Sequence, residues 1–203
     1  MTRFVKVCGI TRQQDADLAV ELGATAIGFV FWPGSPRYVK PEQARSIAAA
    51  LPETVSKVGV FVDEPAALVG ALADHVGLTD VQLHGAESSD YIRTMPRRVI
   101  KAIGLKNAQM PRLDAYGEDV LILLDAYDPV RHGGTGQMVD WSTARAVATL
   151  RPTILSGGLR PENVSEAIVA VKPFGVDVSS GVESAPGIKD PSRMRSFFEA
   201  LHG

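Results

Sequence analysis

The stretch TILSGGLRPENVSEAIVAV (153–171), followed by GVDVSSG (175–181), contains one complete strand–helix unit and the start of the next. The apolar run at 153–155 predicts a β-strand, and the glycine pair that follows predicts a turn. Apolar residues at positions 164, 167, 168 and 171 predict an amphipathic helix. A second apolar run at 176–178 then begins another strand. Strands joined through a helix usually lie parallel, so this stretch predicts a βαβ unit.

The same order recurs along the whole chain. Eight short apolar runs alternate with segments of helical spacing, and most of these runs are almost continuously apolar, which is typical of strands covered on both faces. The predicted strands are 4–7, 26–30, 57–61, 80–83, 99–103, 120–124, 153–155 and 176–178. An open doubly wound sheet would usually carry a glycine-rich fingerprint after its first strand, where this chain has only CGIT. We therefore predict an α/β fold, a (β/α)₈ TIM barrel that forms a single domain over residues 1–203.

Several helix starts are also indicated. Thr11 with Gln14 suggests a capping box, and Asp190 is placed as an N-cap. Prolines occupy the expected first helical position of three helices, at Pro41, Pro161 and Pro191. The stretches 89–95, 109–116 and 141–150 are assigned as helices mainly because the alternation requires one there.

The composition restricts the setting of the protein. The formal net charge of −2 gives no electrostatic reason to bind nucleic acid or anionic membranes. A single cysteine excludes an intramolecular disulfide and suits a reducing compartment. The chain opens on a predicted strand instead of a signal segment, and no apolar run approaches the roughly 20 residues of a membrane span. We expect a cytoplasmic protein that is a monomer or a homodimer, with no nucleic-acid or membrane partner.

Cofactor motifs are missing from the sequence. The histidines have no spacing typical of metal ligands, and neither a P-loop nor a dinucleotide fingerprint is present. These histidines are His75, His84, His132 and His202. We expect a protein without a metal ion or cofactor.

Two glycine-containing loops follow the seventh and eighth predicted strands, where barrel enzymes usually bind phosphate. Backbone N–H groups approach an anion closely in such loops. Each loop alone is also an ordinary turn, but the pair at these two positions predicts a phosphorylated small-molecule ligand. The expected phosphate-binding residues are Gly157, Gly158, Ser179, Ser180 and Gly181.

Candidate acid and base groups stand at the ends of other strands. Cys8 ends the first strand and is either a buried small apolar residue or a thiolate base. Asp125 follows the unbroken apolar run 120–124, where burial without a partner disfavours the charged carboxylate and so suits a general acid. The alternative for Asp125 is a cap of the following loop. Asp128 and Asp177 are rival acids, although Asp177 stands beside the expected phosphate loop.

Further candidates lie in the loops. Arg37 occurs in the proline-stiffened segment 33–38, which suits holding a guanidinium against a carboxylate, although a lone arginine is more often solvated. His84 either faces the pocket or fills a polar turn. Residues 132–136, HGGTG, suggest a mobile loop that closes over substrate.

These motifs together resemble one family. In order, KVCGIT (6–11), GFVFWPGSPRYV (28–39), VQLHGAE (81–87), LLDAYD (123–128) with GGTGQMVDW (133–141), LSGGLRPENV (155–164) and GVDVSSGVESAPGIKD (175–190) are similar to the phosphoribosylanthranilate isomerases. The resemblance implies an Amadori rearrangement in tryptophan biosynthesis, which converts a phosphoribosylated anthranilate to an open-chain amino-ketone phosphate. The chemistry only moves protons within one molecule, so one acid, one base and an anion anchor suffice.

The resemblance also implies roles for individual residues. Asp125 would be the general acid that protonates the furanose oxygen, and Cys8 the base that removes the proton from the second sugar carbon. Arg37 would pair with the anthranilate carboxylate, and Asp177 would orient the sugar or its loop. Gln82 and His84 are expected to contact the substrate.

Other assignments fit the sequence less well. The histidine-pathway sugar isomerase has aspartates at the ends of its first and fifth strands, where this chain has Cys8 and Gly104. Indole-glycerol-phosphate synthase relies on lysines in the barrel mouth, where the fourth strand here offers Gln82. A non-catalytic phosphate binder would have no use for an acid and a base, so an enzyme is expected.

Overall fold

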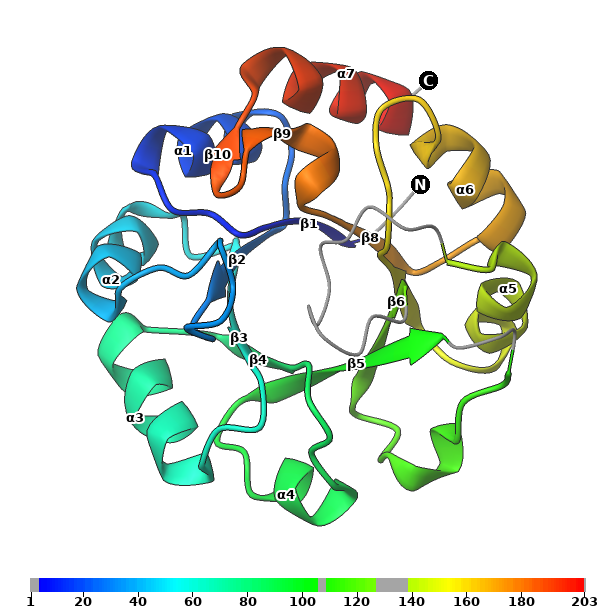
Figure 1. Ribbon diagram of the computed structural model, residues 1–203, viewed down its shortest axis with the longest axis horizontal. Helices are drawn as coiled ribbons and strands as arrows, with labels where there is room; N and C mark the ends of the chain where they lie inside the picture. Colours follow the sequence, from blue (N-terminus) through cyan, green and yellow to red (C-terminus); the bar gives the residue numbers. More distant parts are fainter. Residues whose placement is uncertain (1–3, 106–108, 127–138, 203) are drawn as a thin grey trace.

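The computed structural model describes residues 4–105, 109–126 and 139–202, and it forms a closed barrel of eight parallel strands. The strands pair in chain order, and β1 closes the barrel on β8 (Figure 1). The strands are β1 (Phe4–Cys8), β2 (Ala26–Val30), β3 (Ser56–Phe61), β4 (Asp80–Leu83), β5 (Arg98–Leu105), β6 (Leu121–Ala126), β7 (Thr153–Leu155) and β8 (Gly175–Val178). The predicted (β/α)₈ barrel is confirmed, and each predicted strand is correct to within two residues at either end.

The helices form a ring around the barrel (Figure 1). They are α1 (Gln13–Glu21), α2 (Pro41–Ala50), α3 (Ala66–Val76), α4 (Ser89–Arg93), α5 (Trp141–Leu150), α6 (Val164–Val171) and α7 (Pro191–His202). Their apolar faces and the outward-facing strand residues form the larger core, which includes Val7, Phe29 and Phe197, all fully buried. None of the helices in the described ranges is long and apolar enough to cross a membrane.

Two layers fill the inside of the barrel. Apolar side chains, among them Phe4, Val58 and Leu123, pack at the end where the strands begin. Above them the inward-facing residues become polar, and Lys6 of β1 lies in register with Asp177 of β8. The apolar layer closes the barrel from below, so that only its other end is available for a ligand.

Not every predicted helix is present. The stretch 109–116 contains only a short 3₁₀ turn, η1 (Leu113–Ala115), among its described residues. Pro111 cannot continue a helix begun before it, and Gly117 ends the segment soon after, which leaves room for about one turn. The prediction of a full helix in this unit was therefore wrong.

Two predictions of how helices begin were also wrong. Thr11 donates its hydroxyl hydrogen to the carbonyl oxygen of Gly187 (2.6 Å), and helix α1 begins at Gln13 without a side-chain cap. Helix α6 begins at Val164 and not at Pro161, because Asn163 closes a turn by accepting from the Arg160 N–H (2.9 Å). By contrast, Pro41 and Pro191 are the first residues of their helices.

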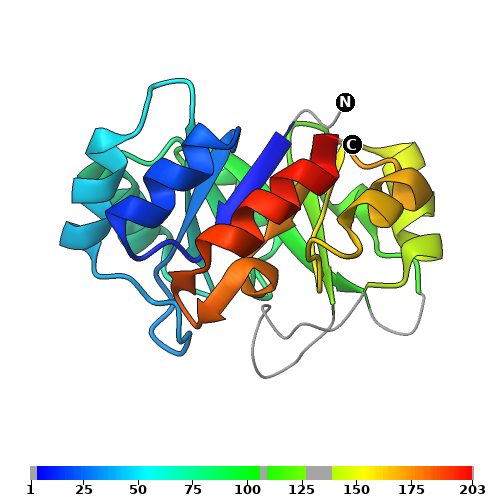
Figure 2. The ribbon, with the colours of Figure 1, turned by 90° about the horizontal axis from the view of Figure 1, so that it is seen from above.

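The connection from β8 to α7 contains structure that was not predicted. After the short turn η2 (Ser180–Val182), strands β9 (Glu183–Ala185) and β10 (Ile188–Lys189) form a small antiparallel hairpin. Figure 2 shows this hairpin at the end of the barrel toward which β1 runs. It therefore lies at the rim where the strands end.

Candidate active site

A cavity of about 430 Å³ opens at the carboxyl ends of the strands. Its lining combines polar groups from five strands or strand ends with a mainly apolar wall from β2, β3 and the loop after β2. The lining residues are Cys8, Val30, Trp32, Gly34, Ser35, Pro36, Arg37, Val60, Val62, Gln82, His84, Asp125, Ser156, Asp177, Ser179 and Pro186. Such a mixture suits a ligand with one apolar part and several polar groups.

Cys8 lies at the end of β1 beside a buried lysine. A Cβ atom at Gly28 would come within 2.9 Å of both the Cys8 Sγ and the Lys6 Cε, so the two side chains meet over this glycine. Lys6 Nζ also donates to Asp177 Oδ1 (2.9 Å). The cysteine, the ammonium and the carboxylate thus form one compact group on β1 and β8.

Burial and charge act in opposite directions on this group. Burial raises the pKa of the Cys8 thiol above its ordinary value, and Lys6 opposes that shift. Burial likewise opposes the charge of Lys6, but Asp177 and then Cys8 raise the pKa of Lys6 to about 12. In the unliganded protein Cys8 is therefore mainly a thiol at neutral pH, whereas a base needs the thiolate. Lys6 stabilises the thiolate fraction that forms.

Asp125, His84 and Gln82 form a chain of polar groups across the cavity. The Nε2 atom of His84 lies 3.4 Å from Asp125 Oδ2, and its Nδ1 lies 3.2 Å from Gln82 Nε2. The other carboxylate oxygen of Asp125 accepts from the Ala126 N–H (2.8 Å). Gln82 Oε1 is buried without a hydrogen-bond partner among the described residues. A buried acceptor that lines a cavity indicates a donor supplied by a ligand.

The two predicted phosphate loops lie against each other. Gly157 and Gly158 have φ values of 79° and 69°, in the left-handed region that favours glycine. A Cβ at Gly181 would come within 1.9 Å of the Leu159 carbonyl oxygen, so the loops approach this closely only with glycine there. The Ser179 hydroxyl is buried without a partner among the described residues. The loops thus offer backbone N–H groups and one unsatisfied hydroxyl to an anion.

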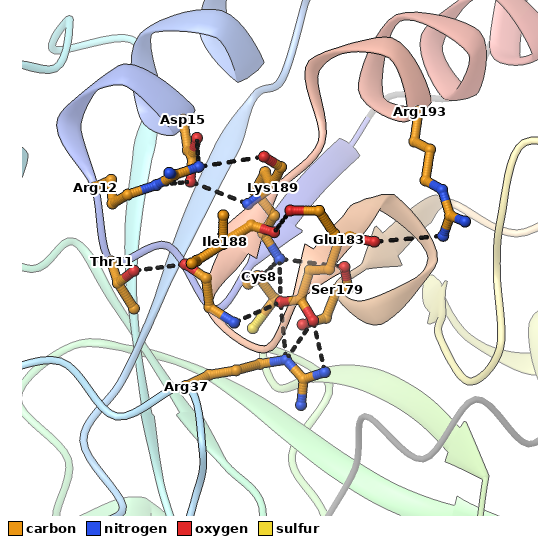
Figure 3. Close-up of polar contacts among 12 residues, drawn as sticks. Cys8, Thr11, Arg12, Asp15, Arg37, Ser179, Glu183, Ile188, Lys189 and Arg193 are labelled. Atoms are coloured by element: carbon orange, nitrogen blue, oxygen red, sulfur yellow. Dashed lines mark hydrogen bonds and ion pairs between the residues drawn. The ribbon is translucent and has the colours of Figure 1, made fainter.

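Arg37 reaches the cavity from the loop after β2, and Glu183 holds it there. Its Nε and Nη2 atoms donate to the two carboxylate oxygens of Glu183 at 2.9 and 2.7 Å, and both side chains are largely buried. Figure 3 shows this paired arrangement, with the third guanidinium nitrogen pointing away from Glu183. Arg37 is therefore a fixed cation at the cavity rim and not a solvated surface residue.

The structure brings most of the predicted site residues to one cavity. Those that line it are Cys8, Arg37, Gln82, His84, Asp125, Asp177 and Ser179. The glycines Gly157, Gly158 and Gly181, together with Ser180, belong to the adjacent loops and do not line it. Asp128 and the loop 132–136 lie outside the described residues.

Three charged residues of the site were missed. Lys6 is fully buried inside an apolar strand, and a lysine in the middle of FVKVC was the available signal. Glu183 and Lys189 are buried in the hairpin and form an ion pair (2.9 Å). Nothing local distinguishes these two from surface charges, since their partners come from distant parts of the chain.

The described residues contain no group of three or more histidine, cysteine, aspartate or glutamate side chains arranged to hold a metal ion. The chemistry that these residues offer is proton transfer to and from a bound ligand by a thiol and a carboxyl group, with groups suited to anion binding beside them.

Comparison with protein families gives one match that covers almost the whole chain. Residues 5–200 match the model of N-(5'-phosphoribosyl)anthranilate isomerases. Two curated relatives with that name, from Geotalea uraniireducens and Geobacter sulfurreducens, are each 48% identical, and the alignments cover 98% of this chain and 98% of each relative.

Solved structures agree with this match. The phosphoribosyl anthranilate isomerase of Thermus thermophilus superposes with a TM-score of 0.90 at 41% identity, covering 98% of each chain. A structure of monomers generated from the dimeric isomerase of Thermotoga maritima gives 0.88 at 43% identity, with the same coverage. A third isomerase structure (TM-score 0.84, 42% identity, 98% of each chain) was solved with reduced 1-(o-carboxyphenylamino)-1-deoxyribulose 5-phosphate bound.

Proposed function

This chain belongs to the N-(5'-phosphoribosyl)anthranilate isomerase family, and we propose that its cavity performs the rearrangement with Cys8 as general base and Asp125 as general acid. The chain is an isomerase of tryptophan biosynthesis. Its reaction converts an N-glycoside of ribose phosphate to an open-chain amino-ketone. One proton donated to the ring oxygen and one removed from the second sugar carbon give an enolamine, which tautomerises to the ketone.

The proposed steps use the two groups in turn. Asp125 donates a proton to the furanose oxygen as the bond from that oxygen to the first sugar carbon breaks, which leaves a Schiff base. The Cys8 thiolate then removes the proton from the second sugar carbon, and the electron pair moves to give an enolamine. Tautomerisation of the enolamine gives the ketone. Each positioned proton transfer contributes roughly 10²–10⁴ in rate.

The observation that carries the proposal is that Cys8 and Asp125 line one cavity from strands β1 and β6, which are not neighbours in the barrel. A sugar ring held between these strands presents different atoms to the two groups. This arrangement supports an acid and a base that act on one substrate without exchanging a proton directly.

The binding roles follow from the charges around the cavity. We assign the anthranilate carboxylate to Arg37 and the phosphate to the loops 156–158 and 179–181, where the Ser179 hydroxyl lacks a partner among the described residues. Gln82 Oε1 supports a hydrogen bond from a sugar hydroxyl, with His84 beside it, and Asp177 orients the sugar. A relative that binds the reduced carboxyphenylamino-deoxyribulose phosphate supports a ligand of this class.

The remaining proposals concern the state of the protein in the cell. We propose a cytoplasmic enzyme, because a single cysteine and a base that must stay reduced suit that compartment. It acts as a monomer or a homodimer, and the dimeric Thermotoga maritima relative supports the second state.

The experiment that tests the activity is a turnover assay with freshly prepared phosphoribosylanthranilate, followed by the loss of anthranilate-derivative fluorescence. The histidine-pathway aminoaldose is assayed in parallel. We expect consumption of the first substrate with multiple turnovers per protein molecule. Quenching that stops at one equivalent would instead indicate a binding protein, and turnover of the second substrate alone would indicate the histidine-pathway enzyme.

A further inference from the structure

Within the proposed function, on which this inference rests, we propose that the buried pair Glu183–Lys189 is a positioning device for Arg37. In this account Glu183 fixes the guanidinium toward the substrate carboxylate. Lys189 cancels the charge of Glu183, so that the cluster facing the substrate keeps one net positive charge. Neither residue touches the substrate in this proposal.

The contact between Glu183 and Arg37 fixes the orientation of the guanidinium. Glu183 accepts from Nε (2.9 Å) and from Nη2 (2.7 Å), which leaves Nη1 without a hydrogen bond to any residue in the described ranges. Arg37 lines the cavity. A guanidinium held on one edge loses little additional rotamer freedom when its remaining N–H groups bind a carboxylate.

Glu183 alone would weaken this site, because a carboxylate beside Arg37 neutralises the charge that attracts the substrate. Lys189 removes this conflict by donating to Glu183 Oε1 (2.9 Å) from a side chain that is almost fully buried. Burial opposes the charge of Glu183, but Arg37 and Lys189 hold its pKa below the ordinary value. Burial lowers the pKa of Lys189, and the neighbouring Glu183 carboxylate opposes that shift. With Lys189 protonated, two cations and one anion leave one positive charge at the cavity rim.

Lys189 also connects this cluster to the rest of the site. Its Nζ donates to the Cys8 carbonyl oxygen (2.6 Å) and to the Ser179 carbonyl oxygen (3.2 Å) (Figure 3). One ammonium thus holds the backbone of the proposed base, the second phosphate loop and the partner of Arg37. The distances between the three substrate-binding regions are fixed by a single residue.

The hairpin that carries the pair is anchored on both sides. From the loop after β1, the Arg12 side chain donates to the Lys189 carbonyl oxygen (3.2 Å). From helix α1, Asp15 accepts from the Lys189 N–H (3.1 Å). From helix α7, Arg193 donates to the Glu183 carbonyl oxygen (3.3 Å). These bonds, drawn in Figure 3, hold the hairpin against the barrel rim, so that Glu183 is a fixed support.

The test compares two ligands that differ only in the ring carboxylate. One is reduced 1-(o-carboxyphenylamino)-1-deoxyribulose 5-phosphate, and the other is its phenylamino counterpart without the carboxylate. The Kd of the phenylamino ligand divided by the Kd of the carboxylate ligand measures carboxylate recognition alone. A general loss of folding or of phosphate binding affects both ligands and leaves this ratio unchanged. Arg37→Ala should reduce this ratio, and an unchanged ratio would instead overturn the carboxylate role of Arg37 within the proposed function.

The positioning role is tested in the same assay with Glu183→Gln, which keeps the shape of the side chain. We expect the ratio to fall about tenfold, which corresponds to about 1.4 kcal/mol, and to show no further fall when Arg37→Ala is already present. Equal weakening of both ligands, or the same fall without Arg37, would overturn the positioning role. Glu87→Gln removes another buried, lysine-paired carboxylate and serves as the matched control.

The charge-balancing role of Lys189 is tested with two further variants. Lys189→Met leaves the cluster neutral, whereas the double variant Glu183→Gln, Lys189→Met restores one net positive charge. We expect the double variant to recognise the ring carboxylate several-fold better than Lys189→Met alone, although it has lost more native groups. A double variant that is no better than Lys189→Met would overturn the charge-balancing role.

Discussion

Lys6 Nζ and Asp177 Oδ1 lie 2.9 Å apart inside the barrel, on the neighbouring strands β1 and β8. Lys6 precedes Cys8 by two residues on β1. Both side chains are buried, and the Cys8 sulfur and the Lys6 Cε meet over Gly28. The thiol is therefore influenced by a cation that stabilises its charged form and by a carboxylate that opposes it. In the proposed mechanism, this relationship influences the pH at which Cys8 acts as a base.

Substitutions of this ion pair should move the titration of Cys8 in opposite directions. Lys6→Met removes the cation and should raise the pKa of Cys8 further, whereas Asp177→Asn removes a repulsive charge and should lower it. The chain has one cysteine, so thiolate absorbance in the ultraviolet, corrected with Cys8→Ser, reports this residue alone. Shifts in the same direction would contradict the account.

Lys101→Met is the matched control for the loss of a buried lysine. Lys101 is also buried and pairs with Glu87 (2.8 Å), but it belongs to β5 and does not line the cavity. We expect this variant to lose stability and to leave the titration of Cys8 unchanged. A shift as large as that of Lys6→Met would mean that loosened packing, and not charge, is responsible.

Asp125→Asn should lower turnover by roughly 10²–10⁴, since an amide cannot donate the acidic proton. The amide oxygen still accepts from the Ala126 N–H, so folding should be retained. Asp80→Asn is the control, because Asp80 is also a buried aspartate but lies at the start of β4, at the end of the barrel opposite the cavity. Steady-state turnover and thermal unfolding of both variants distinguish a loss of catalysis from a loss of stability. A mild loss of turnover in Asp125→Asn would assign the acid role to another residue.

Gly181→Ala should separate the two phosphate loops. Its Cβ would come within 1.9 Å of the Leu159 carbonyl oxygen, so we expect a loss of about 1–3 kcal/mol in stability and weaker inhibition by inorganic phosphate. Gly70→Ala, inside helix α3 with its nearest neighbour at 3.8 Å, should instead stabilise the protein by about 0.5–1 kcal/mol. Unchanged phosphate inhibition in Gly181→Ala would remove these loops from the phosphate site.

The sequence predicted what depends on local pattern. Apolar runs identified all eight strands, and the parallel order follows from their alternation with helices. The positions of Cys8 and Asp125 in the cavity could be predicted because barrels place their sites at strand ends. The helix predicted at 109–116 was wrong because Pro111 and Gly117 leave too little chain between them. This local signal was overlooked because the strand–helix alternation required a helix there.

The charged network at the hairpin could not be predicted from local sequence patterns. Arg37 and Glu183 are 146 residues apart in the chain, and Lys6 and Asp177 are 171 apart. Only the closed barrel brings β1 beside β8 and the loop after β2 beside the hairpin. Sequence patterns therefore identified the cavity-lining groups proposed to contact substrate more readily than the groups that hold them in place.

The most direct test of the central claim is the pH dependence of kcat/KM for phosphoribosylanthranilate in the wild type and in Cys8→Ser, with circular dichroism to confirm folding. If the Cys8 thiolate is the base, wild-type kcat/KM should rise as the pH approaches the raised pKa of the thiol. Cys8→Ser should lose roughly 10²–10⁴ in rate together with that rise. Near-normal turnover in folded Cys8→Ser, with the same pH profile, would show that another group removes the proton.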